Sequence, residues 1–401
     1  MKANKLVSVL KLLAIYLIMG VFCGIVGAVF SKGVQLVTGA RLDNPWLLYL
    51  LPAAGILTAA IYKLLKVSGM GTDQVLNEAD GQCALSAKLA PAVFFASLLS
   101  HLCGASVGKE GAALQLGGSS ALFFSRKFKL SKEQEKTLVY CGMAGVFSSA
   151  FGTPLAAAAF ALEVVLAGRI CFSAALPTLI TSVVSYFTAV LLGAHAERFT
   201  VSAVPTLSLS VVWKVLILAL AAAAIGIVFC LCLKYLKLLF KKLFKNEFLR
   251  IFVGAVAIVL LTFIVGTRDY NGAGIEIMER IFNDGEFAPW AFALKLLFTC
   301  IAVAAGFKGG EIVPTLFIGA TLGAVVGAFL GLPVAFSAAV CMVCLFCSAT
   351  NCPLASILLA AELFSCRGIG YICIAVAISY CISGKISLYA TQKTAGLKSL
   401  F

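Results

Sequence analysis

Long apolar segments follow one another along most of the chain, separated by short stretches rich in charge, glycine or proline. Residues 312–361 hold no Asp, Glu, Lys or Arg, which is enough for two to three membrane crossings of about 20 residues each. The other apolar blocks lie at about 12–30, 47–62, 91–107, 138–162, 170–192, 211–233, 251–266 and 291–307. Several are short or broken by Gly and Pro, so the pattern predicts about 10–14 helices, some of them partial.

Composition supports the same class of protein. The chain has 401 residues, of which 62% are hydrophobic and only 12% charged, whereas a soluble domain is about a quarter charged. A membrane β-barrel would show alternating segments of about ten residues, which do not dominate here. We therefore expect an all-α polytopic membrane protein, embedded in the lipid bilayer.

The formal net charge of +14 changes this picture little. Basic residues cluster at the ends of apolar blocks, in residues 126–136 and 234–250. The positive-inside rule explains both clusters as cytoplasmic loops, so we do not expect nucleic acid as a partner. An anion-attracting field is a second use that this charge could have. The first apolar segment follows lysines and has no clear cleavage site, so we expect a retained helix with a cytoplasmic N-terminus.

An internal repeat divides the chain. Residues 142–165 and 341–364 align without gaps and are identical at nine of 24 positions, including Pro154/Pro353 and Glu163/Glu362. We expect two related halves, 1–205 and 206–401, forming one membrane domain without a soluble regulatory domain. Transporters built in this way form their sites near the midplane, where broken helices from both halves meet.

The first candidate site segment is "GASVGKEGAALQLGG" at residues 104–118. Gly108 and Gly111 permit a non-helical approach, and the apolar run after them predicts a helix from about Glu110. A helix N-terminus binds anions, and the Glu110 carboxylate is a tethered anion beside Lys109. An embedded Glu costs about 3 kcal/mol and is a functional candidate by default. Close packing by the small residues stays open as an alternative for this loop.

The second half offers "FKGGEIVPTLFIGATLG" at residues 307–323. Its paired glycines break the chain, and Pro314 favours an early helical position. The backbone N–H groups near Ile312 and Val313 would then face a site, with Glu311 close by. A third loop, "KVSGMGTDQVLNEADG", places Met70 between two glycines. Both loops keep the same packing alternative.

Other polar residues point to structural roles. Glu163 and Glu362 end helical runs, where a side chain can cap, pair or face an interface. His101 is expected to pack or lie near the surface. Most of the fifteen cysteines lie in apolar runs, without zinc-site spacing, and are expected to pack as small apolar residues. We expect neither cofactor nor metal.

Four motifs give the chain a resemblance over essentially its full length to the CLC family of chloride channels and anion/proton antiporters. "GKEGAALQLGG" resembles the family's G-[KR]-E-G-P stretch, and "GGEIVP" its G-x-F-x-P stretch. "GMGTD" lies where the family has G-S-G-I-P, and Tyr389 falls where it has a pore tyrosine. The resemblance implies a homodimer with one anion pathway in each subunit, built from two inverted helical repeats.

The departures from the family pattern resemble the CLC-F subclass, whose members export fluoride in exchange for protons. The family serine is Met70 here, and Val164 stands where proton antiporters have a second, inner glutamate. Four further departures are Asp73, Ala112, Glu311 and Ile312. The resemblance therefore implies a fluoride/proton antiporter of a bacterial cell membrane, which is not an enzyme.

The expected mechanism assigns gating and proton transfer to Glu110, which plugs the anion site as a carboxylate and leaves it when protonated. The expected anion-binding residues are Met70, Gly108, Lys109, Gly111, Glu311, Ile312, Val313 and Tyr389. Two alternatives stay open: a chloride-type CLC channel or chloride/proton antiporter, and a membrane enzyme or scaffold that uses the same repeat.

Overall fold

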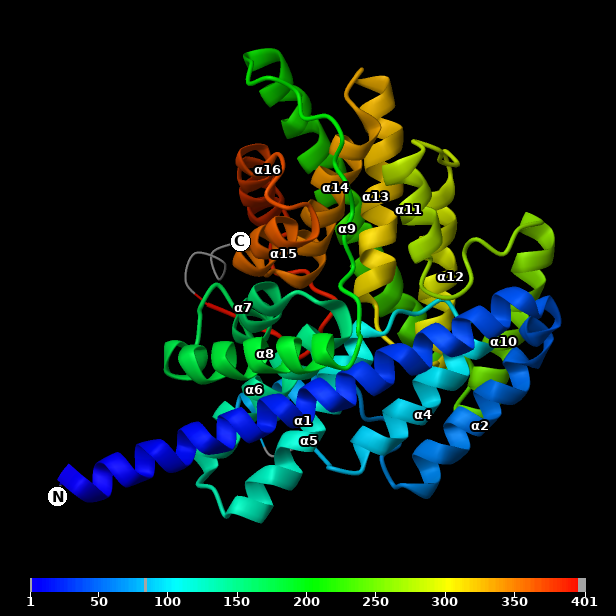
Figure 1. Cartoon of the computed structure of the whole chain (residues 1–401). Helices are drawn as coiled ribbons and strands as arrows, with labels where there is room; N and C mark the ends of the chain where they lie inside the picture. Colours follow the sequence, from blue (N-terminus) through cyan, green and yellow to red (C-terminus); the bar gives the residue numbers. More distant parts are fainter. Residues whose placement is uncertain (1, 83–84, 396–401) are drawn as a thin grey trace.

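The computed structural model describes residues 2–82 and 85–395, and within these ranges the chain forms sixteen α-helices, one 3-10 helix and one pair of two-residue strands (Figure 1). This confirms the predicted all-α class. The elements up to the middle of the chain are α1 (Lys2–Asp43), η1 (Pro45–Leu50), α2 (Leu51–Leu64), α3 (Thr72–Ala79), α4 (Leu89–Leu102), α5 (Glu110–Phe128), α6 (Lys132–Phe151), α7 (Pro154–Val164), β1 (Leu166–Ala167) and α8 (Phe172–Leu191). The later elements are α9 (Leu209–Leu243), α10 (Glu247–Val265), α11 (Ile275–Asn283), α12 (Ala291–Ala305), α13 (Ile312–Phe329), α14 (Val334–Thr350), α15 (Pro353–Leu363), α16 (Ile369–Ile382) and β2 (Lys393–Thr394).

Many of these helices are long and apolar. Six helical stretches of the described chain have the length and composition to cross a membrane: Val9–Asp43, Pro45–Leu64, Phe172–Leu191, Leu209–Leu243, Glu247–Val265 and Ile312–Phe329. Six shorter apolar helices lie among them, including α7 and α15. Together they make a multi-pass membrane protein.

The described chain has sixteen α-helices against the predicted 10–14: the short α3 and α11 lie outside the predicted apolar blocks, and some continuous apolar runs contain two helices. Residues 138–162 hold the end of α6 and most of α7, separated at Gly152, whose φ of +77° closes α6 in the left-handed region. Pro154 then starts α7, since its missing N–H is not needed in a first turn. Asn351 and Pro353 divide α14 from α15 in the same way.

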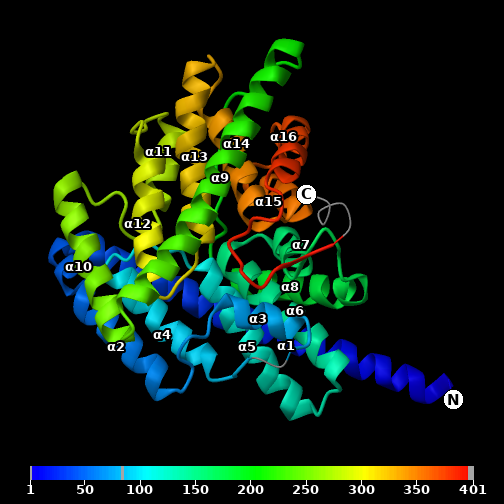
Figure 2. The same ribbon diagram turned by 180° about the vertical axis from the view of Figure 1, so that it is seen from behind.

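Small residues let these helices approach closely. A Cβ added to Gly117 of α5 would lie only 1.8 Å from the carbonyl oxygen of Gly142 in α6, so the two backbones touch there. Figures 1 and 2 show α13, α14 and α16 on one side of the molecule and α1, α5, α6 and α8 on the other, with α7 and α15 packed together where the two groups meet.

Two glutamates cap each other's helices across this meeting point. The carboxylate of Glu163, at the end of α7, accepts hydrogen bonds from the first N–H groups of α15, on Leu354 at 3.1 Å and Ala355 at 2.8 Å. Glu362, near the end of α15, does the same for α7 with two bonds of 2.9 Å each, donated by the N–H groups of residues 155 and 156. The predicted structural role of both glutamates is confirmed, as reciprocal capping.

Candidate functional site

The two Gly-broken segments predicted to approach a site meet directly. Gly108 and Gly310 form an antiparallel bridge, in which each N–H donates to the other's carbonyl oxygen at 2.7 and 2.6 Å. The contact requires glycine, because a Cβ on Gly310 would lie 2.2 Å from the backbone nitrogen of Gly111. The starts of α5 and α13, which follow the two arms of this bridge, are therefore held side by side.

Glu110 is the first residue of α5 and is fully buried. Neither of its carboxyl oxygens has a hydrogen-bond partner in the described part of the chain. The Oε2 atom lies beside the bridge, since a Cβ on Gly108 would be 2.9 Å from it and 2.9 Å from the Val313 side chain. A buried carboxyl group without partners, next to two helix N-termini, has the chemistry of a movable anion or of a proton carrier.

Two cavities lie near this junction, and the charges of their lining residues indicate which side of the membrane each one faces. One cavity, of about 290 Å³, is lined by basic residues from the 234–250 cluster, including Lys237, Lys241 and Arg250. The positive-inside rule places that cluster in the cytoplasm, so we call this the inner cavity. The other, of about 320 Å³, includes Leu42 from the far end of the crossing helix α1, and we call it the outer cavity.

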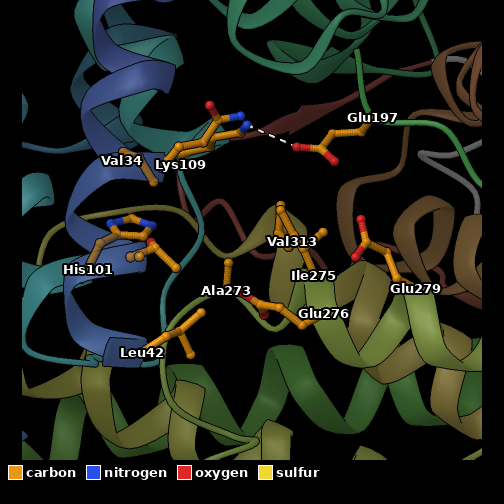
Figure 3. Close-up of a pocket in the computed structure, with 13 residues that line it drawn as sticks. Val34, Leu42, His101, Lys109, Glu197, Ala273, Ile275, Glu276, Glu279 and Val313 are labelled. Carbon is orange, nitrogen blue, oxygen red and sulfur yellow. Dashed lines mark hydrogen bonds and ion pairs between the residues drawn. The ribbon is translucent and has the colours of Figure 1, made fainter. Parts of the chain in front are cut away.

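The outer cavity contains Lys109 (Figure 3). Its ammonium group lies 3.2 Å from a carboxylate oxygen of Glu197 and donates to the Ser31 hydroxyl at 3.2 Å. His101 lines the same cavity and is buried, with Nδ1 bonded to the Ser97 carbonyl and Nε2 without a partner in the described residues. The Lys109 side chain therefore lies in the outer cavity, paired with Glu197.

Carboxylates form the opposite wall of the outer cavity. Glu276 and Glu279 of the short helix α11 face it together with Glu197 (Figure 3). Burial, together with the charges of Glu197 and Glu276, raises the pKa of Glu279. Lys109 aside, the Asp, Glu, Lys and Arg side chains that line the outer cavity are all acidic, in contrast to the basic inner cavity.

The inner cavity gathers three of the predicted residues, Met70, Glu311 and Tyr389. Glu311 lies 3.6 Å from the Lys237 ammonium group. Lys308 is directed instead toward the Tyr62 ring, with its nitrogen 4.1 Å from the ring centre. An anion arriving from the cytoplasm would meet a positive field in this cavity.

The segment after α16 fixes Tyr389 at the inner cavity. Tyr389 is buried, and its hydroxyl has no partner among the described residues. Two residues on, Thr391 donates from its N–H and its hydroxyl to the Asp73 carboxylate, at 3.2 and 3.0 Å. Gln392 donates to the carbonyl of Val164 at 3.0 Å, and β2 then pairs in parallel with β1. Asp73 and Val164, two departures from the family pattern, thus help to hold this segment.

The predicted site residues divide into three groups. Gly108, Gly111, Glu110, Ile312 and Val313 come together at the bridge. Met70, Glu311 and Tyr389 lie in the inner cavity, and Lys109 faces the outer one. In the described ranges, no three His, Cys, Asp or Glu side chains come together in a way that could hold a metal ion.

Sequence reasoning missed the residues that set the charge of both cavities. Glu197 lies in an irregular segment between α8 and α9, where no periodicity marks it. Lys237 belongs to a basic cluster that the sequence explained first by membrane topology and second by an anion-attracting field, without assigning Lys237 itself to the site. Its spacing of four residues from Lys241 was the available signal, because i and i+4 share one face of a helix.

Known proteins share both the sequence and the fold. A "Chloride/fluoride channel protein" from Pseudomonas syringae pv. tomato is 32% identical over 391 residues, covering 96% of this chain and 86% of that protein. A solved "CLC-type fluoride/proton antiporter" is 30% identical, with a TM-score of 0.92 over 96% of this chain and 98% of that one. A "slow cyanobacterial Cl-/H+ antiporter" shares the fold, with a TM-score of 0.81 and 20% identity over 93% of this chain and 94% of that one.

A family model supports the same assignment. The model described as "Voltage gated chloride channel" matches residues 54–384, which include both arms of the glycine bridge. The chain thus belongs to the CLC family of voltage-gated chloride channels.

Proposed function

We propose that this protein is a fluoride/proton antiporter that exports fluoride from the cytoplasm, with Glu110 as its gating and proton-carrying residue. The observation that carries the proposal is the position of the Glu110 carboxyl group. It is buried beside two helix N-termini and has no hydrogen-bond partner in the described residues. The neighbouring start of α13 reaches both cavities, since Val313 lines the outer one and Glu311 the basic inner one.

The proposed cycle uses one site for two occupants. As a carboxylate, Glu110 stands at the helix N-termini and blocks the pathway. When it takes up a proton it loses its attraction to these positive helix ends and swings away. Fluoride from the inner cavity then accepts from the N–H groups of Ile312 and Val313, which have no intrahelical partner at the start of α13.

The remaining predicted residues have supporting roles in this proposal. Met70 and Tyr389 line the inner route. Glu311 reduces the positive charge of the inner cavity by pairing with Lys237. Gly108 and Gly111 allow the two helix starts to meet. Lys109 contributes from the outer side, where it lines the exit. Val164 offers no carboxyl group, so Glu110 carries protons without an inner glutamate.

Similarity supports fluoride over chloride as the exported ion. The chain is 30% identical to a solved fluoride/proton antiporter, and 32% identical to a protein whose name includes both chloride and fluoride. A "Putative chloride channel protein ClcB-like" from Ralstonia nicotianae, at 28% identity over 381 residues, favours the second candidate, a chloride-type CLC channel or antiporter. We also propose a homodimer, as the resemblance to the family implies. Each subunit contains two repeat halves, 1–205 and 206–401, of which the last six residues lie outside the described part.

The test is ion flux from proteoliposomes, followed with fluoride- and chloride-selective electrodes beside a pH probe. The wild-type protein should move fluoride faster than chloride and move protons in the opposite direction. Glu110→Gln should abolish the proton movement, because the amide cannot carry a proton. Equal chloride and fluoride efflux would favour the second candidate, and wild-type proton pumping by Glu110→Gln would overturn the role of Glu110.

A further inference from the structure

Lys109 lines the exit in the cycle above, but its ion pair with Glu197 has no step there, although Lys109 directly adjoins the gating residue. Lys109 precedes Glu110 in the chain and its charge acts on that carboxyl group, but the two form no ion pair in the described residues. Instead its ammonium group lies 3.2 Å from Glu197 and 3.2 Å from the Ser31 hydroxyl, buried at 3% exposure (Figure 3). Two anchors on two different segments therefore hold this lysine in the outer cavity.

The surroundings leave a route from this position to Glu110. Lys109 and Val313 line the same cavity, and the Val313 side chain lies beside Gly108, where Glu110 Oε2 is also found. A lysine side chain has a flexible four-carbon stem and can reorient when its partner is lost. Without its anchors, the ammonium group of Lys109 would turn toward the unpaired carboxyl group of Glu110 and pair with it.

A cation close to a carboxyl group favours its charged form and opposes proton uptake. For an antiporter, a permanent Lys109–Glu110 pair would keep the gate charged and in place. We propose that Glu197 is a positioning residue that holds Lys109 away from Glu110, so that Glu110 is free to bind a proton and leave the anion site. This inference rests on the proposed antiport function.

Other charges also act on this site, and the test must separate them. Around Lys109, the outer cavity presents His101 from α4, Glu197 from the segment after α8, and Glu276 and Glu279 from α11, with Arg41 and Lys295 as further positive groups near His101. Glu197 also acts on Glu110 directly through its own negative charge, and Lys109 acts on it in the opposite sense from its present position. Both the direct field and the holding of Lys109 make loss of Glu197 unfavourable for protonation, so the sign alone does not distinguish them.

A double-mutant cycle distinguishes them. We would measure fluoride efflux and coupled proton uptake across a pH series for wild type, Glu197→Gln, Lys109→Met and the double variant. In the wild-type background, Glu197→Gln should move the midpoint of the pH profile to lower pH by about one unit, the size expected for a new opposite charge nearby. In the Lys109→Met background the same change should produce a clearly smaller shift, because no lysine can be released.

Two further variants serve as controls. Glu279→Gln removes the same charge from the same cavity, but the described residues give Glu279 no ion pair with Lys109, so its shift should be smaller than that of Glu197→Gln. Ser31→Ala removes the second anchor without changing any charge, and should shift the midpoint to lower pH. It also provides the measurement if Glu197→Gln does not fold.

The outcomes are distinct. Equal shifts in the two backgrounds would show that Glu197 acts through its field alone, and would overturn the inference, as would an unshifted profile for Glu197→Gln. Wild-type protein that moves no protons against fluoride would instead contradict the proposed function, before any variant is compared.

Discussion

The reciprocal caps of Glu163 and Glu362 allow a quantitative prediction of stability. Glu163→Gln keeps the shape of the side chain but removes its charge and one of its two acceptor oxygens. One of the N–H groups of Leu354 and Ala355 would then face an amide NH₂ group and lose its partner. Glu163 is only 7% exposed, so water cannot easily replace the lost bond.

The cost can be worked out from these contacts. Loss of a buried hydrogen bond to a charged group costs about 2 kcal/mol, and removal of a negative charge from a helix N-terminus about 1 kcal/mol. We therefore expect Glu163→Gln to destabilise the protein by about 3 kcal/mol. Glu362→Gln makes the matching change where Glu362 is less buried, so its effect should be smaller.

Thermal unfolding of purified protein, monitored by tryptophan fluorescence, shows which of the two variants is destabilised more. Glu163→Gln should lower the unfolding midpoint more than Glu362→Gln does. Whatever protein remains folded should still exchange protons for fluoride, because neither residue carries protons in the proposed cycle. An unchanged midpoint for Glu163→Gln would refute the capping argument. Loss of proton coupling at full stability would give Glu163 a transport role instead.

Two other changes probe the junction and the inner cavity. Gly310→Ala should abolish fluoride efflux, because its Cβ would lie 2.2 Å from the Gly111 nitrogen. Gly370→Ala, with no atom within 4 Å of its Cβ, is the control and should transport like wild type. Normal efflux by Gly310→Ala would show that the bridge is dispensable. Lys237→Gln should raise the cytoplasmic fluoride concentration for half-maximal efflux by about threefold at low salt, and less at high salt. Lys214→Gln, at the other end of the same helix, is the control, and an effect of Lys237→Gln that ignores salt would contradict an electrostatic role.

The sequence predicted the site best where backbone constraints are local. Glycines before an apolar run predicted that α5 starts at Glu110, and the structure places the start there. Pro154 and Pro353 start α7 and α15 by an equally local constraint, although in the sequence they were recognised only as part of the repeat. Such signals depend on residues close together in the chain, so they can be recognised without knowing the fold.

The repeat indicated that the segments of Gly108 and Gly310 would meet, but other contacts between distant segments could not be predicted. Glu163 and Glu362 were recognised as structural, but each caps a helix about 200 residues away, and nothing near either glutamate identifies that partner. Lys109 was assigned to the anion site because it adjoins Glu110. Its direction is decided by Glu197 and Ser31, which lie 88 and 78 residues away in sequence.

The measurement that tests the central claim most directly is proton movement driven by fluoride. Proteoliposomes loaded with fluoride, with equal pH on both sides and no chloride present, would be diluted into fluoride-free buffer while external pH is followed. If Glu110 exchanges protons for fluoride, protons should enter the vesicles as fluoride leaves, in wild type but not in Glu110→Gln. Fluoride efflux by the wild-type protein without proton entry, once the membrane potential is clamped, would contradict the account.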